Sequence, residues 1–172
     1  MNNKLNIFVF SLLLLLGYRA ALANSGTRSV ETTTTISASP EELLNAFLDD
    51  DDLKAWWKVS RSLVERKQGG VWSITWNDWG PEKTQHAWIG VIEELTPDRL
   101  VVSHLVMIEP DMPLLGPMQL EITVKPAGSG SALTVSHRGY RYGEHWDAMY
   151  DAVVQGWDHV LGDLEAWARE EY

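Results

Sequence analysis

The period of the apolar residues changes near residue 140 of this sequence, and this change restricts the fold more than any other feature. From 59 to 138 apolar and polar side chains alternate with a period of two, which is typical of β-strands with one buried face. From 143 to 170 the apolar residues recur at helical spacing. The sequence therefore predicts a sheet followed by one long amphipathic helix, which is the natural cover for the apolar face of the sheet.

Turn residues such as "KQGG", "TPDR" and "AGSG" divide the alternating region into strands. A further strand, about 29–37, precedes them, because "SVETTTTISA" is rich in β-branched residues. The other predicted strands are 60–66, 70–76, 85–94, 100–108, 118–126 and 131–138. Their short connections favour antiparallel pairing throughout the sheet.

Two short helices are predicted between the first strand and the second. Ser39 and Glu42 have the spacing of a capping box, with a proline at the first helical position. Residues 49–52 are all aspartates, and Asp50 or Asp51 can cap the second helix. A calcium loop is not predicted there, because the alternating ligands and the glycine of such a loop are missing.

Residues 1–23 have the pattern of an export signal. Lys4 gives a positive start, 7–16 form an apolar run, and 21–23 supply the small residues of a cleavage site. A run of this length is too short to span a bilayer as a helix. We therefore expect a mature domain of 24–172 that is periplasmic or secreted and keeps no stable membrane anchor after the signal is cleaved.

Charge and composition exclude several classes of function. The formal net charge is −10, which disfavours nucleic acid as a partner. The sequence contains no cysteine, so a disulfide or a cysteine-linked lipid is impossible. No metal-ligand spacing such as HExxH occurs, and neither a metal nor a cofactor is predicted.

Several local patterns resemble the SRPBCC (START/Bet v 1-like) superfamily, in the same order along the chain. They are the strand "GGVWSITW", the pair "GVIEELTPDRLVVSHL", the hairpin "LEITVKPAGSGSALTVSHRGY" and the closing helix "GWDHVLGDLEAW". Within the superfamily they look most like the group named after the C-terminal domain of the activator of Hsp90 ATPase (AHSA1-like), over residues 29–170.

The resemblance implies an α+β fold of the helix-grip type. This fold has a seven-stranded antiparallel curved sheet, two short helices after the first strand, and a long C-terminal helix packed over the sheet with a cavity between them. The superfamily includes carriers, cyclases and cochaperones, so the resemblance implies a fold more specifically than an activity.

Strand alternation predicts which side chains face the cavity. Trp72, Ile74 and Trp76 share one face of their strand, and His137 shares a face with apolar neighbours. In the less regular strands, one register groups Val102 with His104 and another groups His86 with Trp88. The candidate ligand-binding residues are Trp72, Trp76, Trp88, His104, His137, Trp146, Tyr150 and Trp157.

The two histidines in this set allow two interpretations. A neutral imidazole both donates and accepts a hydrogen bond, so His104 and His137 are candidates for acid–base groups or for polar anchors of a ligand. They can equally be bonded to a neighbouring backbone or side-chain group, and no catalytic residue is assigned.

Two glycines and one loop also call for an explanation. Gly156 and Gly162 lie inside the predicted long helix, where each costs about 1 kcal/mol relative to alanine. We expect them to let the helix backbone approach the curved sheet, with tryptophans on either side. The proline-rich loop 108–118 is expected to pack on the core, to cover the cavity as a lid, or to form a docking surface.

Three functions fit these features. The favoured one is an exported protein that binds a small hydrophobic or aromatic ligand in the cavity. The second is a cyclase, dehydratase or hydrolase with His104, His137, Tyr140 or Tyr150 as acid–base groups. The third is a protein-interaction module of the Hsp90-activator type, for which the sequence identifies no protein partner.

Overall fold

The computed structural model describes residues 26–79 and 83–172, so the predicted export signal lies outside the described residues. The observed elements are β1 (Arg28–Ile36), α1 (Pro40–Asn45), α2 (Asp50–Trp56), β2 (Arg61–Val64), β3 (Val71–Trp79), β4 (Thr84–Thr96), β5 (Arg99–Ile108), β6 (Leu115–Ala127), β7 (Gly130–Tyr140) and α3 (Glu144–Glu171). Their order confirms the α+β helix-grip fold that the sequence predicts.

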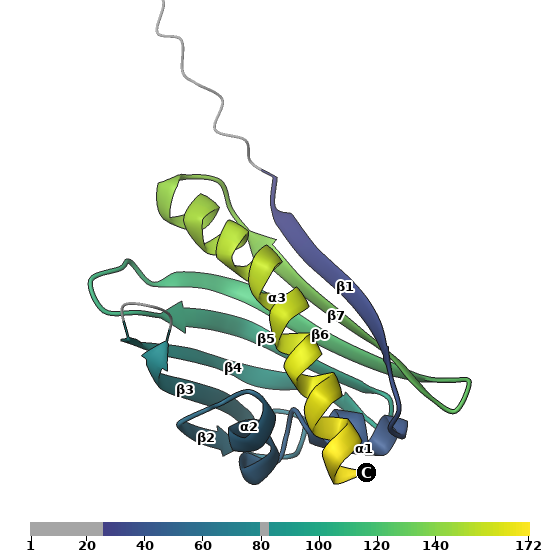
Figure 1. Ribbon diagram of the computed structural model, residues 1–172. Coiled ribbons are helices and arrows are strands. Elements are labelled where there is room, and N and C mark those ends of the chain that lie inside the picture. The colour runs from purple at the N-terminus through teal and green to yellow at the C-terminus, as the bar shows by residue number, and fades with distance from the viewer. Residues whose placement is uncertain (1–25, 80–82) are drawn as a thin grey trace, which may run out of the picture.

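The seven strands form one antiparallel sheet in the order β1-β7-β6-β5-β4-β3-β2. Consecutive strands from β2 to β7 are neighbours, and β1 closes the other edge by pairing with β7. The sheet curves around α3, which crosses its concave face diagonally, while α1 and α2 lie at one end of the same face (Figure 1). All three helices therefore form a single layer on one side of the sheet.

The two short helices begin as their sequences dictate. Ser39 caps α1, its side chain accepts from the backbone N–H of Glu42, and the Glu42 carboxylate accepts from the backbone N–H of Ser39. For α2 the expected cap, Asp50 or Asp51, is wrong by one or two positions. Asp49 caps this helix and accepts from the backbone N–H groups of Asp51 and Asp52, because it is the last residue with extended backbone before the helical turn.

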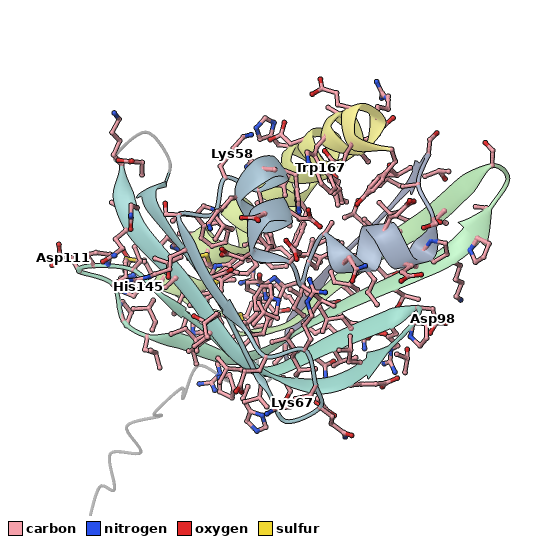
Figure 2. The ribbon with its side chains drawn as sticks, turned by 90° about the horizontal axis from the view of Figure 1, so that it is seen from below. Lys58, Lys67, Asp98, Asp111, His145 and Trp167 are labelled. Carbon is pink, nitrogen blue, oxygen red and sulfur yellow. The ribbon has the colours of Figure 1, made fainter. Side chains whose placement is uncertain are left out.

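The core lies between the concave face of the sheet and the helical layer (Figure 2). The sheet contributes buried side chains from β3, β6 and β7, among them the predicted inward residues Trp72, Ile74, Trp76 and His137. From α3 the buried side chains are Val153, Trp157, Leu161, Leu164 and Ala168. None of the helices in the described ranges is both long and apolar enough to cross a membrane.

The expected role of the two helix glycines is wrong. A Cβ built at Gly156 or at Gly162 has no atom within 4 Å among the described residues, so no close approach to the sheet requires glycine there. Gly162 is exposed and Gly156 is half-buried. Close backbone contacts occur instead at the sheet's turns, as at Gly130, where an added Cβ would lie 2.2 Å from the Ile36 carbonyl oxygen.

The loop 108–118 divides between core and solvent. Leu115 and Met118 are buried and belong to β6, which begins earlier than the sequence suggests. Leu114 is 63% exposed. Part of this segment therefore packs on the core, which was one of the three expectations for it.

Candidate functional site

Five tryptophans, from β3, β4, α3 and the end of α2, meet between the sheet and the helical layer. We call them the tryptophan cluster; they are Trp57, Trp72, Trp76, Trp88 and Trp157. Trp57 follows the last residue of α2 and lies at the centre of the cluster. Its ring centroid is 5.4 Å from that of Trp76, 5.7 Å from that of Trp88 and 5.3 Å from that of Trp157. The cluster therefore joins α2, the sheet and α3.

The buried indoles differ in their hydrogen bonds. Four of them donate inside the protein: Trp56 to Ala46 O (2.8 Å), Trp72 to Phe47 O (2.9 Å), Trp76 to Trp57 O (2.9 Å) and Trp88 to His86 Nε2 (2.7 Å). The Nε1 atoms of Trp57 and Trp157 are equally buried but have no hydrogen-bond partner in the described part of the chain. Every cluster indole on the sheet is thus satisfied, whereas the two on the helical layer are not.

His137 lies beside this cluster and is fully buried. Its ring centroid is 5.2 Å from that of Trp88, and its Nδ1 is 2.9 Å from the Tyr140 hydroxyl oxygen. Burial lowers the pKa of His137 to about 3 and raises the pKa of Tyr140 well above its usual range. Both groups are therefore uncharged near neutral pH. Such a pair suits a fixed hydrogen-bonding role better than a cycle of proton transfer.

His86 is a second buried imidazole on the concave face. Its Nε2 accepts from Trp88, so the ring proton of the neutral form resides on Nδ1, which lies 3.6 Å from Glu109 Oε2. Burial lowers the pKa of His86, and the Glu109 carboxylate acts in the opposite direction. Glu109 also accepts from the Thr84 hydroxyl at 3.2 Å. This imidazole is therefore held on both sides by the protein.

His104 does not lie on the concave face of the sheet, so the expectation that it points to the interior is wrong. It is exposed, with a φ of 51°, while Val102 and Leu105 on either side are both buried. The pairing of β5 with β6 shifts its register between these two residues, as in a β-bulge. The extra residue turns the His104 side chain to the outer face, where it contacts the Ser103 hydroxyl.

Trp146 and Tyr150 lie at the edge of the interior, near the first turns of α3. Both are partly buried, and their rings contact Tyr140 at centroid distances of 6.4 and 5.5 Å. The Tyr150 hydroxyl donates to the Ser29 carbonyl oxygen at 3.3 Å, and the Arg28 guanidinium lies over the Tyr150 ring. These two residues therefore border the tryptophan cluster through Tyr140 rather than joining it.

The structure thus brings together Trp72, Trp76, Trp88, His137 and Trp157 of the predicted set. The most important residue missed is Trp57. Its sequence signal is the doublet "WW" at the end of a short helix, directly before the sheet. Of the acid–base groups considered for an enzyme, His137 and Tyr140 are hydrogen-bonded to each other and the Tyr150 ring contacts Tyr140, whereas His104 is on the opposite face.

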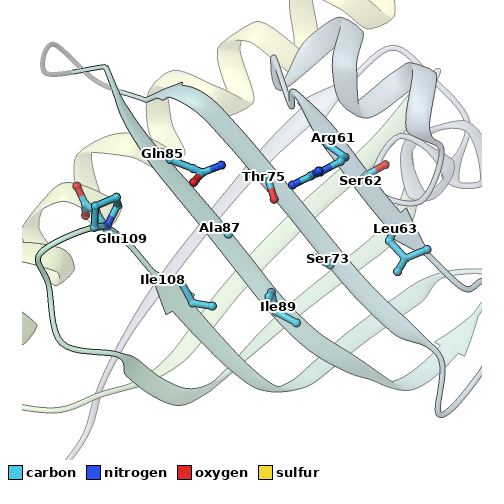
Figure 3. A pocket seen from close by; sticks show the side chains of 11 residues that line it. Arg61, Ser62, Leu63, Ser73, Thr75, Gln85, Ala87, Ile89, Ile108 and Glu109 are labelled. Atoms are coloured by element: carbon cyan, nitrogen blue, oxygen red, sulfur yellow. The ribbon is translucent and has the colours of Figure 1, made fainter.

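The outer face of the sheet carries a separate hollow of about 560 Å³. Figure 3 shows its lining residues, which come from β2, β3, β4 and the end of β5, on the face turned away from α3. Leu63, Ile89 and Ile108 expose apolar side chains there, beside Arg61 and Glu109. The hollow is not the predicted cavity, which is expected on the other face, between the sheet and α3. Across the described ranges no group of three or more acidic or histidine side chains is placed to hold a metal ion.

Comparison with known proteins agrees with the fold. A protein of Chromobacterium violaceum has 25% identity and a TM-score of 0.65, over 81% of this chain and 96% of its own. The AHSA1 protein of Silicibacter pomeroyi has 18% identity and a TM-score of 0.67, over 84% of this chain and 100% of its own. CalU16 of Micromonospora echinospora has 20% identity and a TM-score of 0.59, over 84% and 78%. No curated protein matches the sequence significantly.

The family model described as "Activator of Hsp90 ATPase homolog 1-like protein" matches residues 37–169, which include α1, α2, six of the strands and nearly all of α3. The chain therefore belongs to the family of activator of Hsp90 ATPase homolog 1-like proteins.

Proposed function

We propose that this protein is exported and holds a small hydrophobic or aromatic ligand between the concave face of the sheet and α3. One observation carries the proposal: the tryptophan cluster gathers rings from the sheet, from the end of α2 and from α3 around Trp57. Aromatic walls with few polar groups are typical of sites for flat apolar molecules. The fold of this family also commonly binds ligands in a cavity at this place.

The ligand proposal can be tested on protein purified from the envelope of its own host. Native mass spectrometry should detect a bound small molecule at defined stoichiometry, and organic extraction should release it. The same protein should bind the neutral dye Nile red, and the extracted molecule should displace the dye. An empty protein that also fails to bind Nile red would contradict the proposal.

A matched pair of variants on α3 gives this test its control. Trp157→Ala removes a buried ring of the cluster and should weaken dye binding at least tenfold. Trp167→Ala removes a half-buried ring whose aromatic contact is with Tyr172, outside the cluster, and should leave dye binding unchanged. Circular dichroism would verify that both variants are folded. Equal binding by the two variants would place the ligand elsewhere.

Export is supported by the pattern of residues 1–23, with its positive start, apolar run and small residues before 24. In the native host the protein should be found in the periplasm or the medium, and its mass should correspond to 24–172. An intact chain in the cytoplasmic fraction would refute this part of the proposal and leave the ligand test unaffected.

A further inference from the structure

Buried nitrogen atoms without a hydrogen-bond partner restrict the chemistry of the proposed ligand. In and beside the tryptophan cluster, three buried side-chain nitrogens have no hydrogen-bond partner among the described residues: Nε1 of Trp57, Nε1 of Trp157 and Nε2 of His137. Buried polar groups in folded proteins are almost always paired, so three such atoms in one region are unusual. The rings that carry them all contact Trp88, at centroid distances of 5.7, 6.2 and 5.2 Å.

All three atoms are hydrogen-bond donors. An indole nitrogen always carries its hydrogen and never accepts. For His137 the assignment follows from Tyr140, whose hydroxyl oxygen is 2.9 Å from Nδ1. If Tyr140 donates to Nδ1, the remaining imidazole proton resides on Nε2. In the opposite arrangement the tyrosine hydrogen would have no acceptor in the described part of the chain.

The side chains that carry these three donors are uncharged near neutral pH. Burial lowers the pKa of His137 and raises that of Tyr140, so both are neutral near pH 7, and the indoles are always neutral. A buried carboxylate without a counter-charge is strongly disfavoured. The donors therefore match a neutral oxygen acceptor better than an anion.

From these atoms we infer that the ligand is an uncharged, flat, apolar molecule whose oxygen atoms accept hydrogen bonds from Trp57, Trp157 and His137. A carbonyl or ether oxygen on an aromatic framework has this chemistry, whereas a pure hydrocarbon leaves all three donors unpaired. The inference rests on the proposed function, since it specifies the ligand of the same site.

Three probes of nearly equal shape separate the possibilities. 2-Acetylnaphthalene carries a neutral carbonyl acceptor, 2-isopropenylnaphthalene replaces that oxygen by a methylene group, and 2-naphthoate carries an anionic acceptor. By isothermal titration calorimetry the ketone should bind at least tenfold more tightly than the alkene, because a donor left unpaired in a buried site weakens binding about tenfold. It should also bind more tightly than 2-naphthoate, because a buried carboxylate without a counter-charge is strongly disfavoured.

Nuclear magnetic resonance identifies the donors directly. In ¹⁵N-labelled protein the indole N–H signals of Trp57 and Trp157, assigned by their loss in Trp57→Phe and Trp157→Phe, should move downfield with the ketone and not with the alkene. The signal of Trp72, which already donates to the Phe47 carbonyl oxygen, should not move. In calorimetry Trp157→Phe should reduce the advantage of the ketone over the alkene, and the control Trp167→Phe, outside the cluster, should preserve it.

The outcomes distinguish this inference from the function on which it rests. Equal affinity for the ketone and the alkene would overturn the acceptor inference and leave a hydrophobic carrier. Tightest binding of 2-naphthoate would overturn the uncharged character of the ligand. Failure of all three probes, together with failure of Nile red, would overturn the carrier function and the inference with it.

Discussion

His137 allows a quantitative test of the buried interior, because its imidazole is fully buried and burial lowers its pKa from 6.5 to about 3. Between these two values the unfolded chain binds a proton that the folded protein does not bind. The free energy of unfolding therefore decreases as the pH falls through this range. A solvent-exposed histidine paired with a carboxylate would have the opposite effect, since its folded pKa would be raised.

The size of the effect follows from the two pKa values. The stability lost is RT ln[(1 + 10^(6.5−pH))/(1 + 10^(3−pH))], which amounts to about 0.8 kcal/mol at pH 6 and about 2 kcal/mol at pH 5. His86 is also buried, and burial also lowers its pKa, so it contributes in the same direction. A comparison of the wild type with a variant at His137 removes that background.

Urea unfolding followed by tryptophan fluorescence at about pH 7, 6 and 5 measures this loss. His137→Gln should be less stable at pH 7, but between pH 7 and pH 5 it should lose about 2 kcal/mol less than the wild type. The control His104→Gln, at an exposed position, should keep the slope of the wild type. Parallel pH profiles for the wild type and His137→Gln would refute the buried, neutral state of His137.

Three further substitutions test the local structure. Gly156→Ala should raise the free energy of unfolding by about 1 kcal/mol, because the site is helical and has open space around an added Cβ. A lower free energy of unfolding in urea for this variant would restore a packing role for the glycine. Gly130→Ala should destabilise the protein, since its Cβ would lie 2.2 Å from the Ile36 carbonyl oxygen, and an unchanged melting temperature would disprove that contact. Ser39→Ala should cost about 1 kcal/mol by removal of the α1 cap, whereas equal stability would show that the capping box contributes nothing.

Regular strands made most of the fold predictable from the sequence. In β3 and β7 strict alternation places Trp72, Trp76 and His137 on the buried face, because successive side chains of a strand point to opposite sides. The capping box of α1 was equally predictable, since its two hydrogen bonds involve residues only three positions apart.

The errors occur where a position depends on partners distant in the sequence. His104 is misplaced because a bulge moves it to the outer face, and a bulge is defined by the pairing of β5 with β6. Trp57 was missed because nothing within α2 indicates that its end meets β3, β4 and α3. The glycines of α3 were misinterpreted because helical spacing does not reveal how far the helix backbone stands from the sheet.

The hydrogen bonds of the tryptophans separate their contributions to stability and to the proposed ligand binding. Trp72 and Trp76 donate to backbone carbonyl oxygens at the end of α1 and after α2, and so attach this segment to β3. Loss of either indole would leave a buried carbonyl without its partner, which destabilises the fold. Trp57 and Trp157 have no such bond in the described ranges, so their N–H groups are available to a ligand without any loss inside the protein. The tryptophans of the sheet therefore hold the helical layer in place, whereas those of the helical layer have donors available to the proposed ligand.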